Sequence, residues 1–528
     1  MHRRRLTANR EEKMQEFRIS RRAFMAATAA FGVAGALPGI ARAAAPQRGG
    51  HFRIGIADFG TSDTIDPTTT NTVFQSNLEW QLRNNLAEPG PGGKPVPELA
   101  ESWEPSKDAK SWAFRIRKGV EFHNGKTLTA RDVVYSYQLH TAEGSASVGK
   151  SLIASVEDVR ADGDDVVIFT LKQGNVDFPA ITAYGAFYIV PEGETDFDKG
   201  VGTGGYILEE FRPGIRSLVR RNPNYWKQGR AHFDSVEMIC MRDPAARANS
   251  LITGQIDAYN AVPPQTVALL KRNAGIRINN VASKAHYVFA MPTDVAPFTD
   301  NNVRLALKHA IDREDLVKRV LHGYGAVGND NPLSPAYEMF ADLPQTAYDP
   351  DKVKFYLGKA GLTQLKVPLA VSETPYAGAT DAAVLYKEHA AKAGIDIEVT
   401  KLPEDGYWGA VWEQHVFNAS RWSGNLNADV MLTQAYSADA IKSQYNETRI
   451  NDPRIEKLLV EARGEFDDAK RKEMYGEIQR ILHDEGGALI WAFGNFVDAT
   501  SSKVQHGELS GVAQLDAARA AERWWFAD

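Results

Sequence analysis

Residues 112–136 read Trp-Ala-Phe-Arg-Ile-Arg-Lys-Gly-Val-Glu-Phe-His-Asn-Gly-Lys-Thr-Leu-Thr-Ala-Arg-Asp-Val-Val-Tyr-Ser, and this stretch decides the fold class. Apolar and polar residues alternate over 111–117, as in a half-buried strand. Asn124-Gly125 is a strong turn signal, and Thr129 is placed to cap a helix that begins at Ala130. Strand-like and helical segments go on alternating along the chain, which predicts an α/β protein.

The same patterns predict further elements on both sides of this stretch. Apolar residues at helical spacing predict helices over 303–320, 455–463 and 469–483, while strand-like runs predict strands over 51–57 and 430–434. His123 lies beside the Asn-Gly turn, so we expect it at the surface. The segment 519–525 near the chain end is expected to be a packed tail.

The first 45 residues have the features of an export signal. Arg21 and Arg22 precede a soft apolar run over 23–41, and Ala41 and Ala43 offer a small-residue cleavage site. We interpret residues 1–45 as a twin-arginine signal peptide, which places the mature protein in the periplasm. A membrane anchor is the alternative, but Gly and Pro interrupt the run. Met1 and Met14 both remain possible start sites.

Composition limits what the chain can be. At 528 residues it is too long for a single core, so we expect two or three lobes. Its formal net charge of −6 argues against a nucleic-acid partner. Cys240 is the single cysteine, so no disulfide can form within the chain, and we expect its thiol to be buried.

Motifs for catalysis or cofactors are weak or missing. Residues 200–205 fit a dinucleotide-binding glycine pattern only loosely and lack its strand-to-helix context, so we favour a glycine-bent connection. The sequence contains no G-x-S-x-G, no H-E-x-x-H and no P-loop. We therefore expect no catalytic residues, no cofactor and no metal. An exported hydrolase stays open as an alternative.

Several blocks, in order along the chain, carry a family resemblance. Residues 99–104 and 112–136 closely resemble the family 5 solute-binding proteins, which serve ATP-binding-cassette (ABC) importers for dipeptides, oligopeptides and nickel complexes. Further blocks in the family's order are residues 201–206, 221–226, 251–257, 297–304 with 310–313, and 348–350. The resemblance implies a binding protein that is not an enzyme.

The resemblance also implies an architecture and partners. We expect two α/β lobes joined by a hinge, with an additional small domain. Residues 46–90, 191–285 and 485–528 would form lobe I, 91–190 the additional domain and 286–484 lobe II. The protein would act as a monomer that captures a small-molecule solute and delivers it to a membrane permease with its ATPase. A ligand-presenting sensor or chaperone is a second alternative.

Residues 419–436 are the expected ligand-binding region. In peptide-binding members of the family, the matching stretch has a Trp followed three residues later by an Asp that holds the peptide ammonium. Trp422 matches the Trp, but Asn425 stands at the position of the Asp. Because a neutral amide lacks the charge that an ammonium requires, peptide specificity is open, and sugar-like, amide-bearing or anionic solutes become credible. Asp429 could substitute for the Asp if the loop places it inside.

A second region follows the first predicted strand, where open α/β sheets place ligands. Thr61, Ser62 and Asp63 form this loop. Arg421 is a candidate partner for a carboxylate or phosphate, or simply a solvated charge at a strand end. Trp408, with Tyr407 and Trp412, is a possible lid, although plain packing explains its spacing equally well. The full set of predicted ligand-binding residues is Trp422, Arg421, Ser423, Gly424, Asn425, Asp429, Thr61, Ser62, Asp63, Tyr436 and Trp408.

Overall fold

The computed structural model describes residues 46–90, 93–404, 406–411, 414, 416–442 and 445–527. The expected signal peptide, residues 1–45, lies outside these residues. Among those that the structure describes, no helix is both long and apolar enough to cross a membrane.

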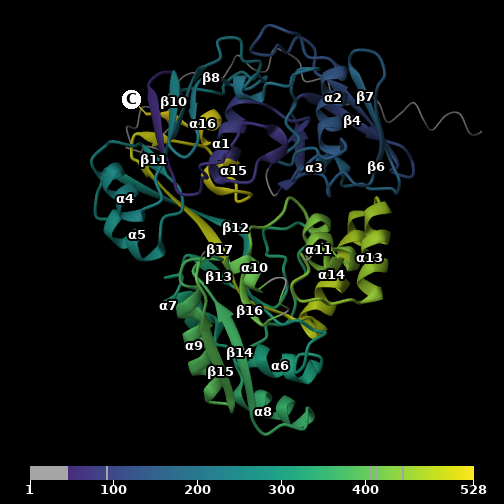
Figure 1. The fold of residues 1–528 in the computed structure, drawn as a ribbon, viewed down its shortest axis with the longest axis vertical. Helices are drawn as coiled ribbons and strands as arrows, with labels where there is room; N and C mark the ends of the chain where they lie inside the picture. The colour runs from purple at the N-terminus through teal and green to yellow at the C-terminus, as the bar shows by residue number, and fades with distance from the viewer. Residues whose placement is uncertain are drawn as a thin grey trace, which may run out of the picture. The chain divides into compact units, whose positions relative to one another are not determined.

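One large mixed sheet runs through the described chain (Figure 1). Its order is β15-β14-β16-β12-β17-β11-β1-β10-β9-β8, and β13 pairs with β17 outside this path. Its strands are β15 (Ile395–Lys401), β14 (Leu365–Val371), β16 (Asn418–Trp422), β12 (Ile276–Ala290), β17 (Ala488–Ser501), β11 (Ala258–Tyr259), β1 (His51–Ile56), β10 (Ser235–Cys240), β9 (Arg216–Arg221), β8 (Tyr206–Arg212) and β13 (Gly325–Val327).

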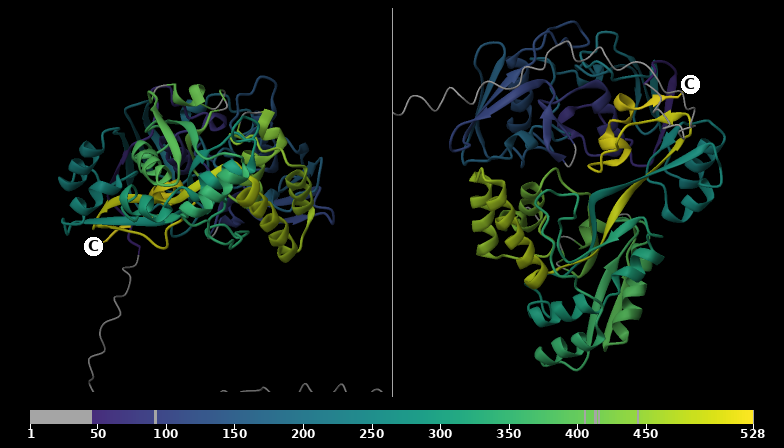
Figure 2. Two further views of the ribbon diagram at one scale, coloured as in Figure 1. Left: turned by 90° about the horizontal axis from the view of Figure 1, so that it is seen from below. Right: turned by 180° about the vertical axis from the view of Figure 1, so that it is seen from behind.

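The two longest strands hold the centre of this sheet. β12 and β17 pair antiparallel from Ile276↔Ser501 to Ala290↔Ala488 and run side by side in both figures of the fold (Figures 1 and 2). The pairing is interrupted between Ala282 and His286. Strands from residues 51–259 lie on one side of this pair, and strands from 365–422 lie on the other.

A separate antiparallel sheet has the order β4-β5-β7-β6 and is covered by α2. Its core is aromatic, with Phe114, Tyr137, Phe169 and Phe187 all buried. These strands are β4 (Ala100–Pro105), β5 (Ser111–Ile116), β7 (Val166–Leu171) and β6 (Val156–Ala161), and two short ladders pair β2 (Ala87–Pro89) with β3 (Pro95–Pro97) and β18 (Val504–Gln505) with β19 (Trp525–Phe526).

Helices cover the sheets and build the remaining cores. α6, α8 and α9 pack around β14 and β15, while α11, α13 and α14 share a core with β12, β16 and β17. The helices are α1 (Val73–Leu82), α2 (Ala130–Thr141), α3 (Phe178–Ile181), α4 (Pro244–Ile252), α5 (Pro264–Leu270), α6 (Asn301–His309), α7 (Arg313–Arg319), α8 (Pro350–Lys359), α9 (Ala379–Ala391), α10 (Tyr407–Val411), α11 (Ala428–Tyr436), α12 (Ala438–Lys442), α13 (Pro453–Gly464), α14 (Asp468–Glu485), α15 (Gln514–Ala518) and α16 (Ala520–Arg523).

Most sequence-predicted elements are confirmed, including the strand at 51–57 and the helices at 455–463 and 469–483. The strand predicted over 430–434 is wrong, because these residues belong to α11. Asn427 caps this helix by accepting a hydrogen bond from the Val430 N–H. The helix predicted over 303–320 is interrupted, since Asp312 caps a new helix there and accepts from the Asp315 N–H.

His123 is half-buried rather than a surface residue, which corrects the sequence expectation. Its Nε2 lies 3.1 Å from the Gly204 carbonyl oxygen, and its backbone N–H donates to the Gly202 carbonyl. Burial lowers its pKa to about 4, so the imidazole is neutral at pH 7. A Cβ at Gly202 would fall 2.1 Å from the Leu82 carbonyl oxygen, so close packing explains this glycine.

Cys240 ends β10 and is half-buried. Burial raises the pKa of its thiol to about 12, so it stays protonated and unreactive at neutral pH.

A buried ion pair ties α7 to the segment beyond β13. The Arg313 guanidinium donates to both Asp330 carboxylate oxygens at 2.7 and 2.8 Å, and the two side chains are 2% and 0% exposed. The same guanidinium donates to the carbonyl oxygens of Lys308 and Thr346. Its charge is therefore balanced by a single buried carboxylate.

Replacing Asp330 tests this pair. Asp330→Ala should lower the free energy of unfolding by about 3–5 kcal/mol, because it leaves a buried guanidinium without its counter-charge. Urea unfolding followed by tryptophan fluorescence measures the change. Glu398→Ala, which removes an exposed ion pair with Lys366, is the control and should leave the midpoint almost unchanged. Equal midpoints for the two variants would contradict the assignment.

Candidate functional site

The segment 419–436 is built from a strand, a tight turn and a capped helix. β16 pairs antiparallel with β12, and His286 stands opposite Trp422 at the strand end. The chain then turns at Gly424, whose φ of 88° is left-handed. A Cβ there would fall 2.5 Å from the Cβ of Lys284, so only glycine fits this close approach to β12.

Trp422 and Tyr436 are brought together in one apolar core. Trp422 is 8% exposed, and its Nε1–H donates to Glu447 Oε1 at 3.1 Å. The Tyr445 ring lies 6.4 Å from the Trp422 ring. Both predicted aromatic residues are therefore packed, and Glu447, which the sequence did not suggest, is their polar neighbour.

The polar groups of Asn425 and Asp429 already have partners. The Asn425 backbone N–H donates to Tyr337 Oη at 2.8 Å, and its Nδ2–H donates to Gln434 Oε1 at 3.0 Å. Arg463 Nε donates to both Asp429 carboxylate oxygens at 2.8 and 3.0 Å. The charge of Asp429 is thus neutralised within the protein, which leaves it poorly suited to hold a ligand ammonium.

Arg421 and Ser423 are exposed. Neighbouring strand residues point to opposite faces, so Arg421 lies on the other face of β16 from Trp422. It stands opposite Tyr287 on β12. Burial raises the pKa of Tyr287, and the charge of Arg421 partly offsets this rise.

Trp408 lies on α10, half-buried, with its ring 5.3 Å from that of Tyr407. The Tyr407 hydroxyl donates to the Ala419 carbonyl at 2.6 Å and so fastens α10 to β16. Trp412 lies outside the described residues.

The loop Thr61–Asp63 is not brought to this segment by any contact of the described residues. Asp63 is buried and accepts from the Gly60 N–H at 3.0 Å and the Thr72 hydroxyl at 3.1 Å. Burial raises the pKa of Asp63. Thr61 and Ser62 are exposed, and Thr61 packs near Gly214 in the turn between β8 and β9. This loop is therefore tied to the β1 side of the large sheet.

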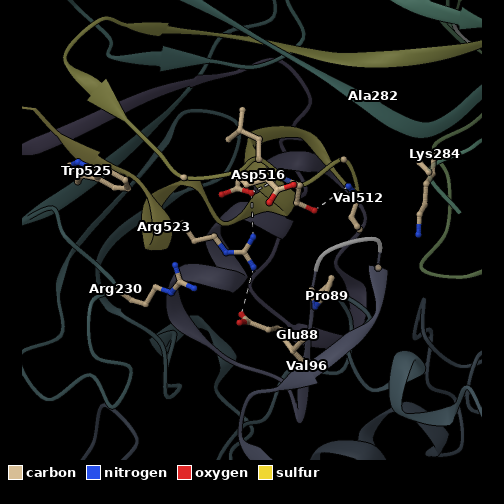
Figure 3. A pocket seen from close by; sticks show the side chains of 18 residues that line it. Glu88, Pro89, Val96, Arg230, Ala282, Lys284, Val512, Asp516, Arg523 and Trp525 are labelled. Atoms are coloured by element: carbon tan, nitrogen blue, oxygen red, sulfur yellow. Dashed lines mark hydrogen bonds and ion pairs between the residues drawn. The ribbon is translucent and has the colours of Figure 1, made fainter. Parts of the chain in front are cut away.

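A cavity of about 510 Å³ lies beside the interruption in β12 (Figure 3). Its wall combines charged and apolar side chains, and none of the eleven predicted ligand-binding residues lines it. The side chains that define it include Glu88, Arg230, Lys284, Asp516, Arg523 and Trp525. A second cavity of about 40 Å³ is lined by Tyr337 and Leu426, and Lys284 lines both.

Lys284 connects the cavities to the predicted segment. Although it is 3% exposed, its Nζ–H donates to the Leu426 carbonyl at 2.6 Å, and the ammonium lies 4.5 Å from the centre of the Tyr337 ring. Burial lowers its pKa to about 8. Because Lys284 lies within the interruption of β12, it couples this strand to the loop that carries Asn425.

A buried charge network backs the larger cavity. Arg519 is 1% exposed and pairs with Glu88, Glu98 and Glu522 at 2.6 to 2.9 Å. Lys227 contacts the same three carboxylates. The tail predicted to be packed is therefore packed, through ion pairs as well as apolar contacts.

The chain enters this tail through a left-handed turn. Leu515, Asp516, Ala517 and Ala518 have φ values of 54°, 60°, 58° and 62°. Such a conformation costs about 1–2 kcal/mol per non-glycine residue. The Asp516 carboxylate helps to offset this conformational cost, because it accepts a hydrogen bond from the Ser510 N–H and pairs with Arg523 at 3.2 Å. The turn holds Asp516 on the cavity wall.

Sequence reasoning missed Lys284, Tyr337 and Glu447. None belongs to a motif, and each acquires its role through contacts far along the chain. Within the described residues, no three His, Cys, Asp or Glu side chains are grouped to hold a metal ion.

Comparisons with known proteins agree with this architecture. A family model described as "Bacterial extracellular solute-binding proteins, family 5 Middle" matches residues 94–443. Di/tripeptide-binding protein 2 of Pseudomonas aeruginosa is 26% identical, with 86% of this chain and 92% of the relative covered. Heme-binding protein A of Haemophilus influenzae is 28% identical, with 81% and 83% covered.

Solved structures confirm the expected two-lobe α/β fold. The periplasmic binding protein DppA of Helicobacter pylori, in complex with a peptide, matches with a TM-score of 0.77 and 21% identity over 91% of this chain and 99% of that one. The oligopeptide-binding protein AppA of Bacillus subtilis, in complex with a nonapeptide, matches with a TM-score of 0.73 and 23% identity over 92% and 100%. Since the family model spans more than half of the sequence, the chain belongs to family 5 of the bacterial extracellular solute-binding proteins, which capture solutes for ABC importers.

Proposed function

We propose that this chain is a periplasmic receptor that closes over a peptide-like solute and hands it, chemically unaltered, to an ABC permease with its ATPase. The contact between Lys284 and Leu426 carries the proposal, because it joins a long central strand to the segment 419–436. In this proposal the protein acts as a monomer. Nothing in the family assignment favours the exported hydrolase that the sequence left open.

The proposed motion is a hinge at β12 and β17, where the pairing is interrupted. Lobe I would comprise residues 46–90, 191–285 and 485–528, the additional domain 91–190, and lobe II 286–484. Contacts between the additional domain and lobe II would break on opening. Among the described residues they include the ion pairs Arg471–Asp177 and Lys94–Glu338 and the hydrogen bond from the Val176 N–H to the Arg463 carbonyl.

Relatives favour a peptide-like solute. The similar proteins include one named for binding di- and tripeptides, and the two solved structures described above hold peptides. Within the segment 419–436, backbone groups at a strand end and a buried indole are suited to a short extended chain. Asn425 is neutral and Asp429 is paired with Arg463, so neither can serve as the counter-charge of a solute ammonium. In this proposal an ammonium of the solute is held elsewhere.

Peptide binding can be measured by thermal shift and calorimetry. Di- and tripeptides at a hundred times their dissociation constant should stabilise the protein by about 2.7 kcal/mol and raise its melting temperature. Trp422→Phe keeps most of the buried ring but removes the donor to Glu447, so we expect affinity to fall about tenfold or more while the unliganded midpoint drops only slightly. Trp103→Phe, on the four-stranded sheet, is the matched control and should keep full affinity. Equal losses of affinity in both variants would count against the site.

The buried ammonium of Lys284 predicts a pH dependence of stability. Its pKa is about 8 in the folded protein against 10.5 for the ordinary side chain, so between these values the unfolded chain binds more protons. The free energy of unfolding of the wild type, relative to that of Lys284→Met, should therefore rise by about 2 kcal/mol between pH 7.5 and pH 10. Urea midpoints at the two pH values measure this difference. Lys366→Met, which removes an exposed lysine, should track the wild type. Parallel curves for wild type and Lys284→Met would refute the assignment.

We also propose export through the twin-arginine route. Replacing Arg21 and Arg22 with Lys should leave the precursor in the cytoplasm, because the paired arginines are the recognised feature. Cell fractionation and immunoblotting measure the exported fraction. Replacing Arg3 and Arg4 with Lys is the control and should leave export intact. Undiminished export of the first variant would rule out this route.

A further inference from the structure

Two hydrogen-bond donors on one side of the larger cavity lack partners. Arg230 and Trp525 both line this cavity of about 510 Å³, and Figure 3 shows them on the same side. No hydrogen bond or ion pair joins the half-buried Arg230 guanidinium to any residue that the structure describes. The Trp525 indole Nε1–H is buried and has no acceptor among the same residues. Because a buried donor without an acceptor costs free energy, this pair of donors indicates a place for an acceptor from outside the chain.

Contacts between the flanking residues hold the two donors next to each other. The Ala231 N–H donates to the Glu522 carbonyl oxygen at 2.8 Å. The His232 ring lies 5.9 Å from the Trp525 ring. The segment that carries Arg230 is therefore fixed against the C-terminal tail.

A left-handed turn carries Arg230. Its neighbours Gly229 and Ala231 have φ values of 69° and 54°. Ala231 is 1% exposed and packs into the core on the β1 side of the large sheet, while Arg230 lines the cavity. A left-handed alanine is disfavoured, and strain of this kind gathers at ligand sites. The left-handed turn over 515–518 borders the same cavity.

The carboxylates of the cavity wall are engaged or exposed. Glu88 pairs with Arg519 at 2.6 Å, and Asp516 pairs with Arg523 at 3.2 Å. Glu508 is the third carboxylate of the wall, and it is exposed, so solvent screens its charge. The Arg230 guanidinium therefore has no counter-ion in contact with it among the described wall residues.

One positive charge is left over among the charged groups at the cavity. Of the described residues that line the cavity or back it from the buried network, five cations face four carboxylates when the exposed Glu508 is left aside. Lys284 counts as a cation, because its pKa of about 8 leaves it charged at pH 7. The cations are Lys227, Arg230, Lys284, Arg519 and Arg523, and the carboxylates are Glu88, Glu98, Asp516 and Glu522. A single bound anion would balance this set.

We propose that this side of the cavity is a subsite for one oxyanion of the solute, such as a carboxylate, with the Arg230 guanidinium as its counter-charge and the Trp525 indole N–H as a further donor. The planar guanidinium can donate to two oxygens of one oxyanion at once. The cavity volume lies in the range of small-molecule sites, so it has room for more of the solute than this group. The proposal rests on the proposed function, since it takes the oxyanion to belong to the captured solute. It places the anionic end of the solute against the C-terminal tail, outside the segment 419–436.

The test compares Ala-Phe with its C-terminal amide by calorimetry on the full mature protein. Amidation removes the negative charge, so the wild type should prefer the acid by about tenfold or more, as expected for hydrogen bonds to a charged group. Arg230→Gln should reduce this preference to threefold or less, because a neutral side chain then meets both peptides. Trp525→Phe keeps a ring but loses the N–H, so it should remove only part of the preference.

An exposed arginine of β9 supplies the matched control. Arg220→Gln breaks an exposed ion pair with Glu209 and should keep the wild-type preference. Since Arg230 has no partner among the described residues, Arg230→Gln should leave the unliganded melting temperature near that of the wild type. This measurement separates a loss of the subsite from a loss of the fold.

Each remaining outcome decides the proposal. If the wild type binds acid and amide equally, or if Arg230→Gln keeps the preference, the subsite is wrong and the receptor function still stands. If neither peptide binds, the peptide-like solute is wrong, and succinate and inorganic phosphate then test the subsite alone by thermal shift. A rise in melting temperature with either ion that Arg230→Gln abolishes supports the subsite and identifies the class of oxyanion. No rise with either ion overturns it.

Discussion

The structure depends on one constraint, the antiparallel pairing of β12 with β17 across the large sheet. These two strands belong to both halves of that sheet, so any rearrangement of one half against the other must be absorbed along them. The pairing is interrupted between Ala282 and His286, and Lys284 sits in this interruption with its ammonium buried. A buried ammonium is costly unless it is bonded, and its bond to the Leu426 carbonyl ties β12 to the loop that follows β16.

The C-terminal tail is held to the β1 side of the large sheet by buried charges. Arg519 and Lys227 share Glu88, Glu98 and Glu522 in a largely buried network. Buried ion pairs add little net stability, but breaking one is expensive, so they enforce a single arrangement. The same rigidity tolerates the left-handed turn that begins at Leu515, whose N–H donates to Asp498 at 2.8 Å. A strained turn persists only where several surrounding contacts together hold its conformation.

The sequence predicted elements well where local signals decide them. Alternation at 111–117, the cap at Thr129 and the amphipathic pattern at 455–463 each correspond to an observed element. The strand expected over 430–434 failed because the capping bond from Asn427 outweighs the β-propensity of a short apolar run. As ligand-binding residues, Trp422 and Tyr436 stay predictions, and only Trp422 was named from the family pattern. Lys284 and Glu447 could not be found from the sequence, since their roles arise only when residues over a hundred positions away, or on a separate loop, come into contact.

The charges around Trp422 are compensated within the protein by residues from other elements. Asn425 is engaged with Gln434, and Asp429 is held by Arg463, so the helix start after β16 presents no uncompensated charge. Glu447 reaches the Trp422 indole from a separate loop, in which Asn446 donates to the Ile450 carbonyl. The packing of this segment is thus set by contacts from several elements, and a fold that binds many solutes can vary such contacts while its strands and helices stay in place.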